Sequence, residues 1–145
     1  MKINTVQHIT EEIADALSDF IFQLNSDIKA PSRAWLEEVI DSGGTTLFIA
    51  EDNGIKGTLT LVIQKTPTGK KAWIEDVVVD NSSRGKGIGE KLIEHAIKHA
   101  LESGVLKIDL TSSPERIAAN KLYKRLGFQL RDTNVYRLNL YSDKH

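Results

Sequence analysis

The sequence contains no cysteine, three prolines and a single methionine. Without cysteine the chain has no disulfide, no thiolate ligand for zinc and no cysteine nucleophile, and it suits a reducing compartment. We expect the fold to depend on a hydrophobic core instead. The 145 residues, 40% of them hydrophobic, are enough to form such a core in a single domain over residues 1–145.

An excess of charge of one sign is also lacking. Nineteen Lys and Arg residues against twenty Asp and Glu residues give a net charge of -1, so the chain lacks the basic excess typical of nucleic-acid-binding proteins. No stretch approaches the ~20 apolar residues of a membrane-spanning helix. No long apolar run follows Lys2, so we expect no signal peptide. These absences predict a cytoplasmic protein with neither nucleic acid nor membrane as a partner.

The first third of the chain has the patterns of one short strand and two helices. Residues 2–9 are predicted to form an edge strand, and Thr10 is a candidate N-cap for a helix whose apolar residues recur at helical spacing. Pro31 suits the first turn of a second helix that ends at the glycines 43–44. Trp35 of that helix is expected to pack in the core between the helices.

The middle of the chain changes to patterns typical of strands. Residues 46–51 and 56–64 flank Asn53-Gly54, a dipeptide typical of two-residue hairpins because both central positions of the turn need positive φ. A turn at residues 67–69 leads into a third strand over residues 72–79. We therefore expect an antiparallel meander of three strands.

Helices and strands alternate in the last third of the chain. A strand, a helix and a strand around residues 80–89 are expected to make a parallel pair through a right-handed crossover, within an otherwise antiparallel sheet. The predicted fold is a mixed α/β sheet in the order β-α-α-β-β-β-α-β-α-β-β. The last five elements are a helix with apolar residues from Ile88 to Leu101, a strand over residues 105–110, a helix from a capped start at 113–115 to Gly127, and two closing strands over residues 128–130 and 135–140.

A glycine-rich loop joins the third strand of the meander to the long helix. Gly85, Gly87 and Gly89 alternate along it, and glycine lets the backbone approach a ligand without hindrance from a Cβ atom. The start of a helix leaves N–H groups unpaired and carries the positive end of the helix dipole. Arg84 and Lys86 add positive charge. The loop therefore predicts a phosphate or pyrophosphate site.

Two familiar nucleotide motifs are excluded by the spacing of this loop. The residue after Gly89 is Glu90, whereas the Walker motif requires Gly-Lys-Ser/Thr. The glycines follow G-x-G-x-G, whereas the dinucleotide motif requires G-x-G-x-x-G. A flexible turn that only caps the helix is the alternative interpretation.

Two segments resemble motifs of the GCN5-related N-acetyltransferases. Residues 79–89, V-D-N-S-S-R-G-K-G-I-G, resemble the family signature Arg/Gln-x-x-Gly-x-Gly/Ala at Arg84, Gly87 and Gly89. Residues 119–128, A-N-K-L-Y-K-R-L-G-F, resemble the later motif of the family, in which a helix carries a tyrosine and is followed by Gly-Phe. The predicted order of elements also agrees with the fold of this family, so the resemblance covers nearly the whole chain.

The resemblance implies acetyl-coenzyme A as the co-substrate and no metal. Backbone amides of the glycine loop would hold the pyrophosphate, and the end of the preceding strand would pair with the pantetheine arm like an added strand. The amide of Val77 would also stabilise the oxyanion. The cofactor-binding residues implied in this way are Val77, Val78, Val79, Arg84, Gly85, Lys86, Gly87, Ile88, Gly89 and Asn120.

Acetyl transfer to an amine also requires a base and an acid. The resemblance assigns the acid that protonates the departing thiolate to Tyr123, whose alternative role is that of a core aromatic. Glu75 is the candidate base, acting through a water molecule, and its alternative role is a solvated charge on a strand. Regular alternation predicts that Glu75 shares a strand face with Val77 and Val79, while Asp76 faces the other side unless a bulge intervenes.

The acceptor is left open by the sequence. Residues 74–79 look similar to the glucosamine-6-phosphate acetyltransferase branch, but no phosphate-binding cluster for such a substrate is recognisable. We predict a primary amine of a small molecule. The alternatives are a protein lysine or N-terminal amine, and a non-catalytic acyl-CoA sensor. By analogy with the family, a closing strand with Val135, Leu138 and Leu140 would take part in a homodimer.

His95 and His99 are four residues apart on the long predicted helix, a spacing that can bind a metal. The sequence offers no clear third ligand, so we predict that both lie on a solvated flank of the helix.

Overall fold

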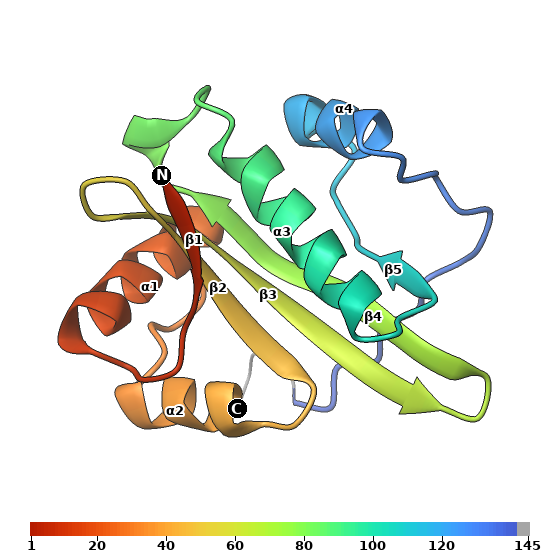
Figure 1. Ribbon diagram of the computed structural model, residues 1–145, viewed down its shortest axis with the longest axis horizontal. Coiled ribbons are helices and arrows are strands. Elements are labelled where there is room, and N and C mark those ends of the chain that lie inside the picture. Colours follow the sequence, from red (N-terminus) through yellow and green to blue (C-terminus); the bar gives the residue numbers. More distant parts are fainter. Residues whose placement is uncertain (142–145) are drawn as a thin grey trace. The chain divides into compact units, whose positions relative to one another are not determined.

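The computed structural model describes residues 1–141 and contains a mixed sheet, on which the first three helices pack (Figure 1). The chain divides into two compact units, Met1–Thr111 and Ser112–His145. The elements are β1 (Lys2–Thr5), α1 (Glu11–Leu24), α2 (Arg33–Asp41), β2 (Thr45–Glu51), β3 (Ile55–Thr66), β4 (Gly69–Val79), the 3-10 turn η1 (Asn81–Ser83), α3 (Ile88–Glu102), β5 (Lys107–Asp109) and α4 (Ile117–Arg125).

The two N-terminal helices begin at side-chain caps. Thr10 accepts a hydrogen bond from the amide of Ile13 (3.2 Å), which confirms it as the N-cap of α1. The second helix, α2, begins at Arg33 and not at Pro31, because Ser32 caps it by accepting from the amide of Trp35 (3.0 Å). A Ser oxygen satisfies an amide that would otherwise lack a partner at the first turn, which accounts for the later start.

The sheet has the order β1-β2-β3-β4-β5. As predicted, β2, β3 and β4 form an antiparallel meander, and the β2–β3 turn places Asn53 and Gly54 at φ 56° and 108°. Lys71–Trp73 of β4 pairs in parallel with Lys107–Asp109 of β5, after the chain has crossed over through α3. The predicted parallel pair is therefore confirmed, although β5 is shorter than expected.

The core has two parts, one on each face of the sheet. On one face, the side chains of Leu47 and Ile49 pack with buried residues of α1 and α2. Phe48 lies between them in sequence and points to the opposite face, where α3 covers the sheet. Gly57 of β3 allows the close approach of α3, because a Cβ there would lie only 3.2 Å from a methyl carbon of Leu92.

Both histidines of α3 pack on the buried ring of Phe48. Their ring centroids lie 4.9 Å (His95) and 5.5 Å (His99) from that of Phe48, in edge-to-face geometry. The prediction of a solvated flank is therefore only partly right, because both side chains are half-buried. The reason is that Phe48 of β2 lies on the face of the sheet that α3 covers. Burial, with smaller effects from His99 and Lys98, lowers the pKa of His95, which favours the neutral ring that packs on Phe48.

Within the second unit, α4 begins later than predicted. The helix starts at Ile117 after Arg116, which provides no side-chain cap, and residues 113–115 form a turn before it. The helix ends before Gly127, which has φ 103°.

The two closing strands predicted over residues 128–130 and 135–140 are not formed in the described part of the chain. A strand requires a neighbouring strand for its backbone N–H and C=O groups, and no such ladder includes this segment. From residue 130 to residue 141 the large apolar side chains are 75–93% exposed; they are Leu130, Val135, Tyr136, Leu138, Leu140 and Tyr141. Alternating apolar residues alone therefore did not determine strand formation here.

Helix length and hydropathy give no candidate membrane span anywhere in residues 1–141.

Two leucines of α3 provide a matched test of the core. The helical pattern placed Leu92 and Leu101 on one apolar face, but Leu92 is fully buried and Leu101 is 74% exposed. We expect Leu92→Ala to lower the free energy of unfolding by about 2–5 kcal/mol, because it leaves a cavity against the sheet. Leu101→Ala should change it by less than about 0.5 kcal/mol. Urea unfolding measures both, and equal losses would contradict the described packing.

Candidate active site

The feature that organises the site is a β-bulge in β4. Thr58 of β3 pairs with Val78 of β4, and Thr60 pairs with Glu75. One residue of β3 therefore lies opposite two residues of β4, numbers 76 and 77. Asp76 takes the left-handed conformation with φ 49°, which Asp tolerates better than most residues.

The bulge changes which side chains share a face. Thr58 and Thr60 point to the same side of β3, so their partners Val78 and Glu75 do so as well. The prediction that Glu75 shares its face with Val77 and Val79 is therefore wrong, because it assumed a regular strand. The sequence predicts that Asp76 faces the other side of the strand unless a bulge intervenes. A bulge does intervene at that residue.

Beyond Trp73, the edge of β4 that faces β5 has no strand partner within the first unit. The short strand β5 pairs with β4 only at Lys71–Trp73, whereas β4 continues to Val79. This edge includes the bulge and residues 77–79. An unpaired strand edge can bind an extended, amide-containing chain through its backbone groups, as in strand addition.

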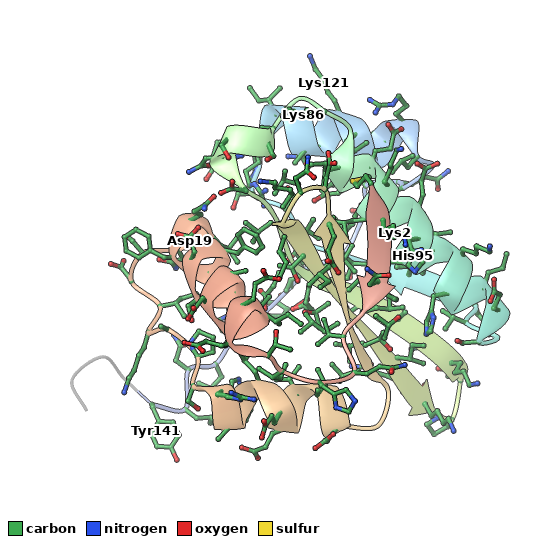
Figure 2. All side chains as sticks on the ribbon, turned by 60° about the vertical axis from the view of Figure 1, so that its left-hand side comes forward. Lys2, Asp19, Lys86, His95, Lys121 and Tyr141 are labelled. Carbon is green, nitrogen blue, oxygen red and sulfur yellow. The ribbon has the colours of Figure 1, made fainter. Side chains whose placement is uncertain are left out.

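The glycine loop follows this edge and leads into α3. Gly85 and Gly87 have φ 81° and 78°, a conformation that favours glycine, and a Cβ added at either would meet no atom within 4 Å. Gly87 is the N-cap of α3 and provides no side-chain hydrogen bond, so the first amides of α3 remain open to a ligand. Arg84 and Lys86 precede them in the loop and are both exposed, and Figure 2 labels Lys86. The geometry suits an anion at this helix end.

A glutamine of α1 holds the start of the loop. Gln23 donates to Asp80 Oδ1 (2.9 Å) and accepts from the amide of Asn81 (3.0 Å). Its Nε2 also donates to Asp19 (2.8 Å), which Figure 2 labels on α1. The hydrogen bonds from Ser82 and Gln23 lower the pKa of Asp80, so it stays ionised and keeps these partners. Sequence reasoning missed Gln23 because it lies 57 residues from Asp80 and has no local signal.

The second feature of the candidate site is a cavity of about 260 Å³ between the two N-terminal helices, the loop joining them, and the sheet. Sequence reasoning did not identify it, and it expected Trp35 to be core. That expectation is wrong, since Trp35 is 56% exposed at the cavity. The lining residues are Leu17, Ile21, Ile28, Lys29, Pro31, Trp35, Leu36, Val39, Leu47, Thr58, Thr60 and Asp76.

Two adjacent carboxyl groups lie at the bulge. Burial raises the pKa of Glu75, and the neighbouring charge of Asp76 raises it further. Burial also raises the pKa of Asp76. Both side chains keep contact with solvent, so the groups are partly desolvated and still accessible to a substrate. A carboxylate with a raised pKa is a stronger base than an ordinary one.

The two candidate residues of the second unit are positioned by local contacts. Tyr123 is buried and packs edge-to-face on Phe128, with ring centroids 6.0 Å apart. Burial raises its pKa, and the charge of Arg116 partly opposes this. The amide nitrogen of Asn120 donates to the carbonyls of Ser113 (2.9 Å) and Arg116 (2.8 Å). A contact from Asn120 to a cofactor would therefore use its side-chain oxygen.

Among the residues that the structure describes, no three His, Asp or Glu side chains are grouped to hold a metal ion.

The family profile described as the acetyltransferase (GNAT) family matches residues 10–128. The chain belongs to this family. GNAT acetyltransferases use acetyl-CoA as co-substrate, and this protein is an acetyl-CoA-dependent acetyltransferase. The family and the mixed α/β fold agree with what the sequence predicted.

Two curated relatives and one solved structure are similar to this GNAT protein. Glucosamine 6-phosphate N-acetyltransferase 1 of Oryza sativa subsp. japonica is 30% identical over 130 residues, covering 81% of this chain and 77% of the relative. Glucosamine 6-phosphate N-acetyltransferase of Trypanosoma brucei brucei is 37% identical over 100 residues, covering 66% of this chain and 65% of the relative. The structure of a putative acetyltransferase from Agrobacterium tumefaciens str. C58 has a TM-score of 0.83 at 22% sequence identity. The match covers 96% of this chain and 100% of that one, and it shows a shared fold.

Proposed function

We propose that this GNAT acetyltransferase transfers the acetyl group of acetyl-CoA to the primary amine of a small molecule by direct attack of the amine. The observation that carries the proposal is the cavity that adjoins the bulge of β4 in the first unit. A cavity lined by helices on one side and by the sheet on the other suits a small acceptor, whereas a protein substrate would need an open groove.

In this proposal the cofactor binds along β4 and the glycine loop. The amides of residues 84–89 hold the pyrophosphate, because the positive-φ glycines leave the backbone open at the start of α3. The unpaired edge at Val77–Val79 pairs with the amides of pantetheine. Val77 lies in the bulge without a partner on β3, so its N–H is suited to the carbonyl oxygen of the thioester. Asn120 contributes its side-chain oxygen.

Glu75 serves as the general base through a water molecule. An ammonium ion has no lone pair, so the acceptor must lose a proton before or during attack on the thioester. The raised pKa of Glu75 makes its carboxylate a better proton acceptor than that of an ordinary glutamate. The residue paired with Glu75 on β3 is Thr60, which lines the cavity.

Tyr123 serves as the acid for the departing thiolate. Burial raises its pKa above that of an ordinary tyrosine, so the hydroxyl stays protonated through the working range. A thiol has a pKa of about 8.5, so complete proton transfer from this tyrosine is uphill. Tyr123 therefore donates a hydrogen bond to the sulfur as negative charge develops on it, and its proton passes to the thiolate as the tyrosine takes up a proton from solvent.

The loop is tested by two glycines with the same backbone conformation. Gly87 precedes α3 at φ 78°, and Gly104 follows it at φ 79°. Alanine at either position should cost about 1–2 kcal/mol of stability through backbone strain. Only Gly87→Ala should weaken acetyl-CoA binding, by about 10–100-fold, because misplaced amides lose hydrogen bonds to the pyrophosphate. Calorimetry with acetyl-CoA measures this, and equal affinity in the two variants would remove the loop from the cofactor site.

The base is tested by Glu75→Gln, with Glu94→Gln on the exposed side of α3 as the control. We expect kcat/KM at pH 7 to fall by about 10²–10⁴-fold in the first variant and to stay unchanged in the second. Wild-type kcat/KM should also decline as the pH falls through the pKa of Glu75, which lies above 4.5, because protonation removes the base. Thiol release against pH measures both. Full activity of Glu75→Gln would exclude this role.

The acid is tested by Tyr123→Phe, with the exposed Tyr136→Phe as the control. We expect kcat to fall by about a hundredfold in Tyr123→Phe, with the affinity for acetyl-CoA unchanged, because the ring still packs on Phe128. Steady-state rates and calorimetry on one preparation separate the two effects. A Tyr123→Phe enzyme with the wild-type rate would show that the hydroxyl has no catalytic role.

A further inference from the structure

The cavity next to the bulge has an unusual division of apolar and polar residues. Eight of its twelve lining residues are apolar, and they come from α1, α2, the connecting loop and β2. The polar atoms come mainly from the strands, where Thr58, Thr60 and Asp76 lie. Lys29 is the only cationic residue among those that line the cavity. The cavity therefore has an apolar body and one polar, acidic end.

The apolar body combines buried and exposed side chains. Leu17, Leu36 and Leu47 are buried and belong to the hydrophobic core, so this part of the lining is rigid. Ile28 and Trp35 are 48% and 56% exposed, although both are large and apolar. Exposed apolar side chains that converge on a cavity over a packed core are typical of a binding site for an apolar group.

The polar end is rich in hydrogen-bond acceptors, with a carboxylate and two threonine hydroxyls. Thr58 is buried, and its hydroxyl already donates to the carbonyl of Phe48 (2.9 Å), so only its lone pairs remain for a ligand. Asp76 offers a carboxylate, and the bulge brings it to the cavity. An ammonium group has three donors and a positive charge, which matches this end. A phosphate group has only acceptors and negative charge.

The charge at the bulge favours the same kind of ligand. Glu75 and Asp76 are adjacent and partly desolvated, so their two negative charges repel each other more strongly than in water. A cation placed beside Asp76 relieves this repulsion. It also brings the amine next to the residue proposed as the base.

From these features we infer that the acceptor is a primary amine that carries an apolar alkyl or aryl group and no phosphate. Its ammonium lies beside Asp76 and its apolar group lies against Trp35 and Ile28. The inference rests on the proposed function and narrows it. It differs from the activity that the names of the two glucosamine 6-phosphate relatives give, because the cavity has one cationic lining residue and an acceptor-rich end.

A series of amines tests the substrate class by thiol release from acetyl-CoA. Among linear alkylamines from propylamine to hexylamine, we expect kcat/KM to rise about fourfold for each added methylene, the factor that corresponds to burial of one CH₂. 2-Phenylethylamine should exceed glucosamine and glucosamine 6-phosphate by at least about a hundredfold, since each of these buries less apolar surface. If kcat/KM does not change with alkyl chain length and glucosamine 6-phosphate is acetylated rapidly, the inference is overturned and the proposed function stands.

Variants locate the effect in the cavity. Trp35→Ala should lower kcat/KM for 2-phenylethylamine by more than about tenfold, without changing the affinity for acetyl-CoA. The control is Phe22→Ala, an aromatic of α1 that is 61% exposed and does not line the cavity. Asp76→Asn keeps the side-chain shape and tolerates the left-handed backbone, and it should raise KM for the amine. Asp52→Asn in the β2–β3 turn is its control. Equal behaviour of each variant and its control would overturn the inference.

Direct binding separates the two proposals. Calorimetry with 2-phenylethylamine, in the absence of acetyl-CoA, should show binding that Trp35→Ala weakens. If the amine binds in this way and no amine is acetylated, the ligand class stands and the proposed reaction fails. If acetyl-CoA binds and glucosamine is acetylated while 2-phenylethylamine neither binds nor reacts, the proposed reaction stands and the ligand class fails.

Discussion

One extra residue in β4 determines the arrangement of the site. Ile74 and Val78 are four residues apart, so a regular strand would place both on one face. The bulge instead leaves Ile74 paired with Leu61 on the face under α3 and turns Val78 to the face under α1. It also releases Val77 from the β3 ladder and brings Asp76 to the cavity. The bulge carries backbone strain, because Asp76 is a non-glycine residue at positive φ.

Helix α1 connects the two halves of the proposed site. Through Leu17 and Ile21 it lines the cavity, and through Gln23 it holds Asp80 and Asn81 at the start of the glycine loop. The capped start at Thr10 and the buried Phe20 fix this helix on the sheet. The proposed acceptor cavity and the loop therefore share one rigid support, which suits a reaction that requires two substrates to meet in one geometry.

Much of the fold was predictable because its signals are local. Thr10 caps a helix through an atom three residues away, and Asn53-Gly54 closes a hairpin through its own φ angles. The predictions failed where a neighbour distant in sequence decides the outcome. His95 and His99 pack because Phe48 lies beneath them, and residues 128–140 form no strand because alternation cannot supply a pairing partner.

The sequence by itself determined the order of elements through α4, the glycine loop and the family, since each depends on short motifs whose residue types have fixed conformational preferences. Only the tertiary structure decided that Glu75 shares a face with Val78, that Asp76 reaches the cavity, and that Trp35 lines it. The physical reason is that a bulge is a mismatch between two strands. Whether β4 has one residue too many is defined only by β3, whose Thr58 and Thr60 take Val78 and Glu75 as partners.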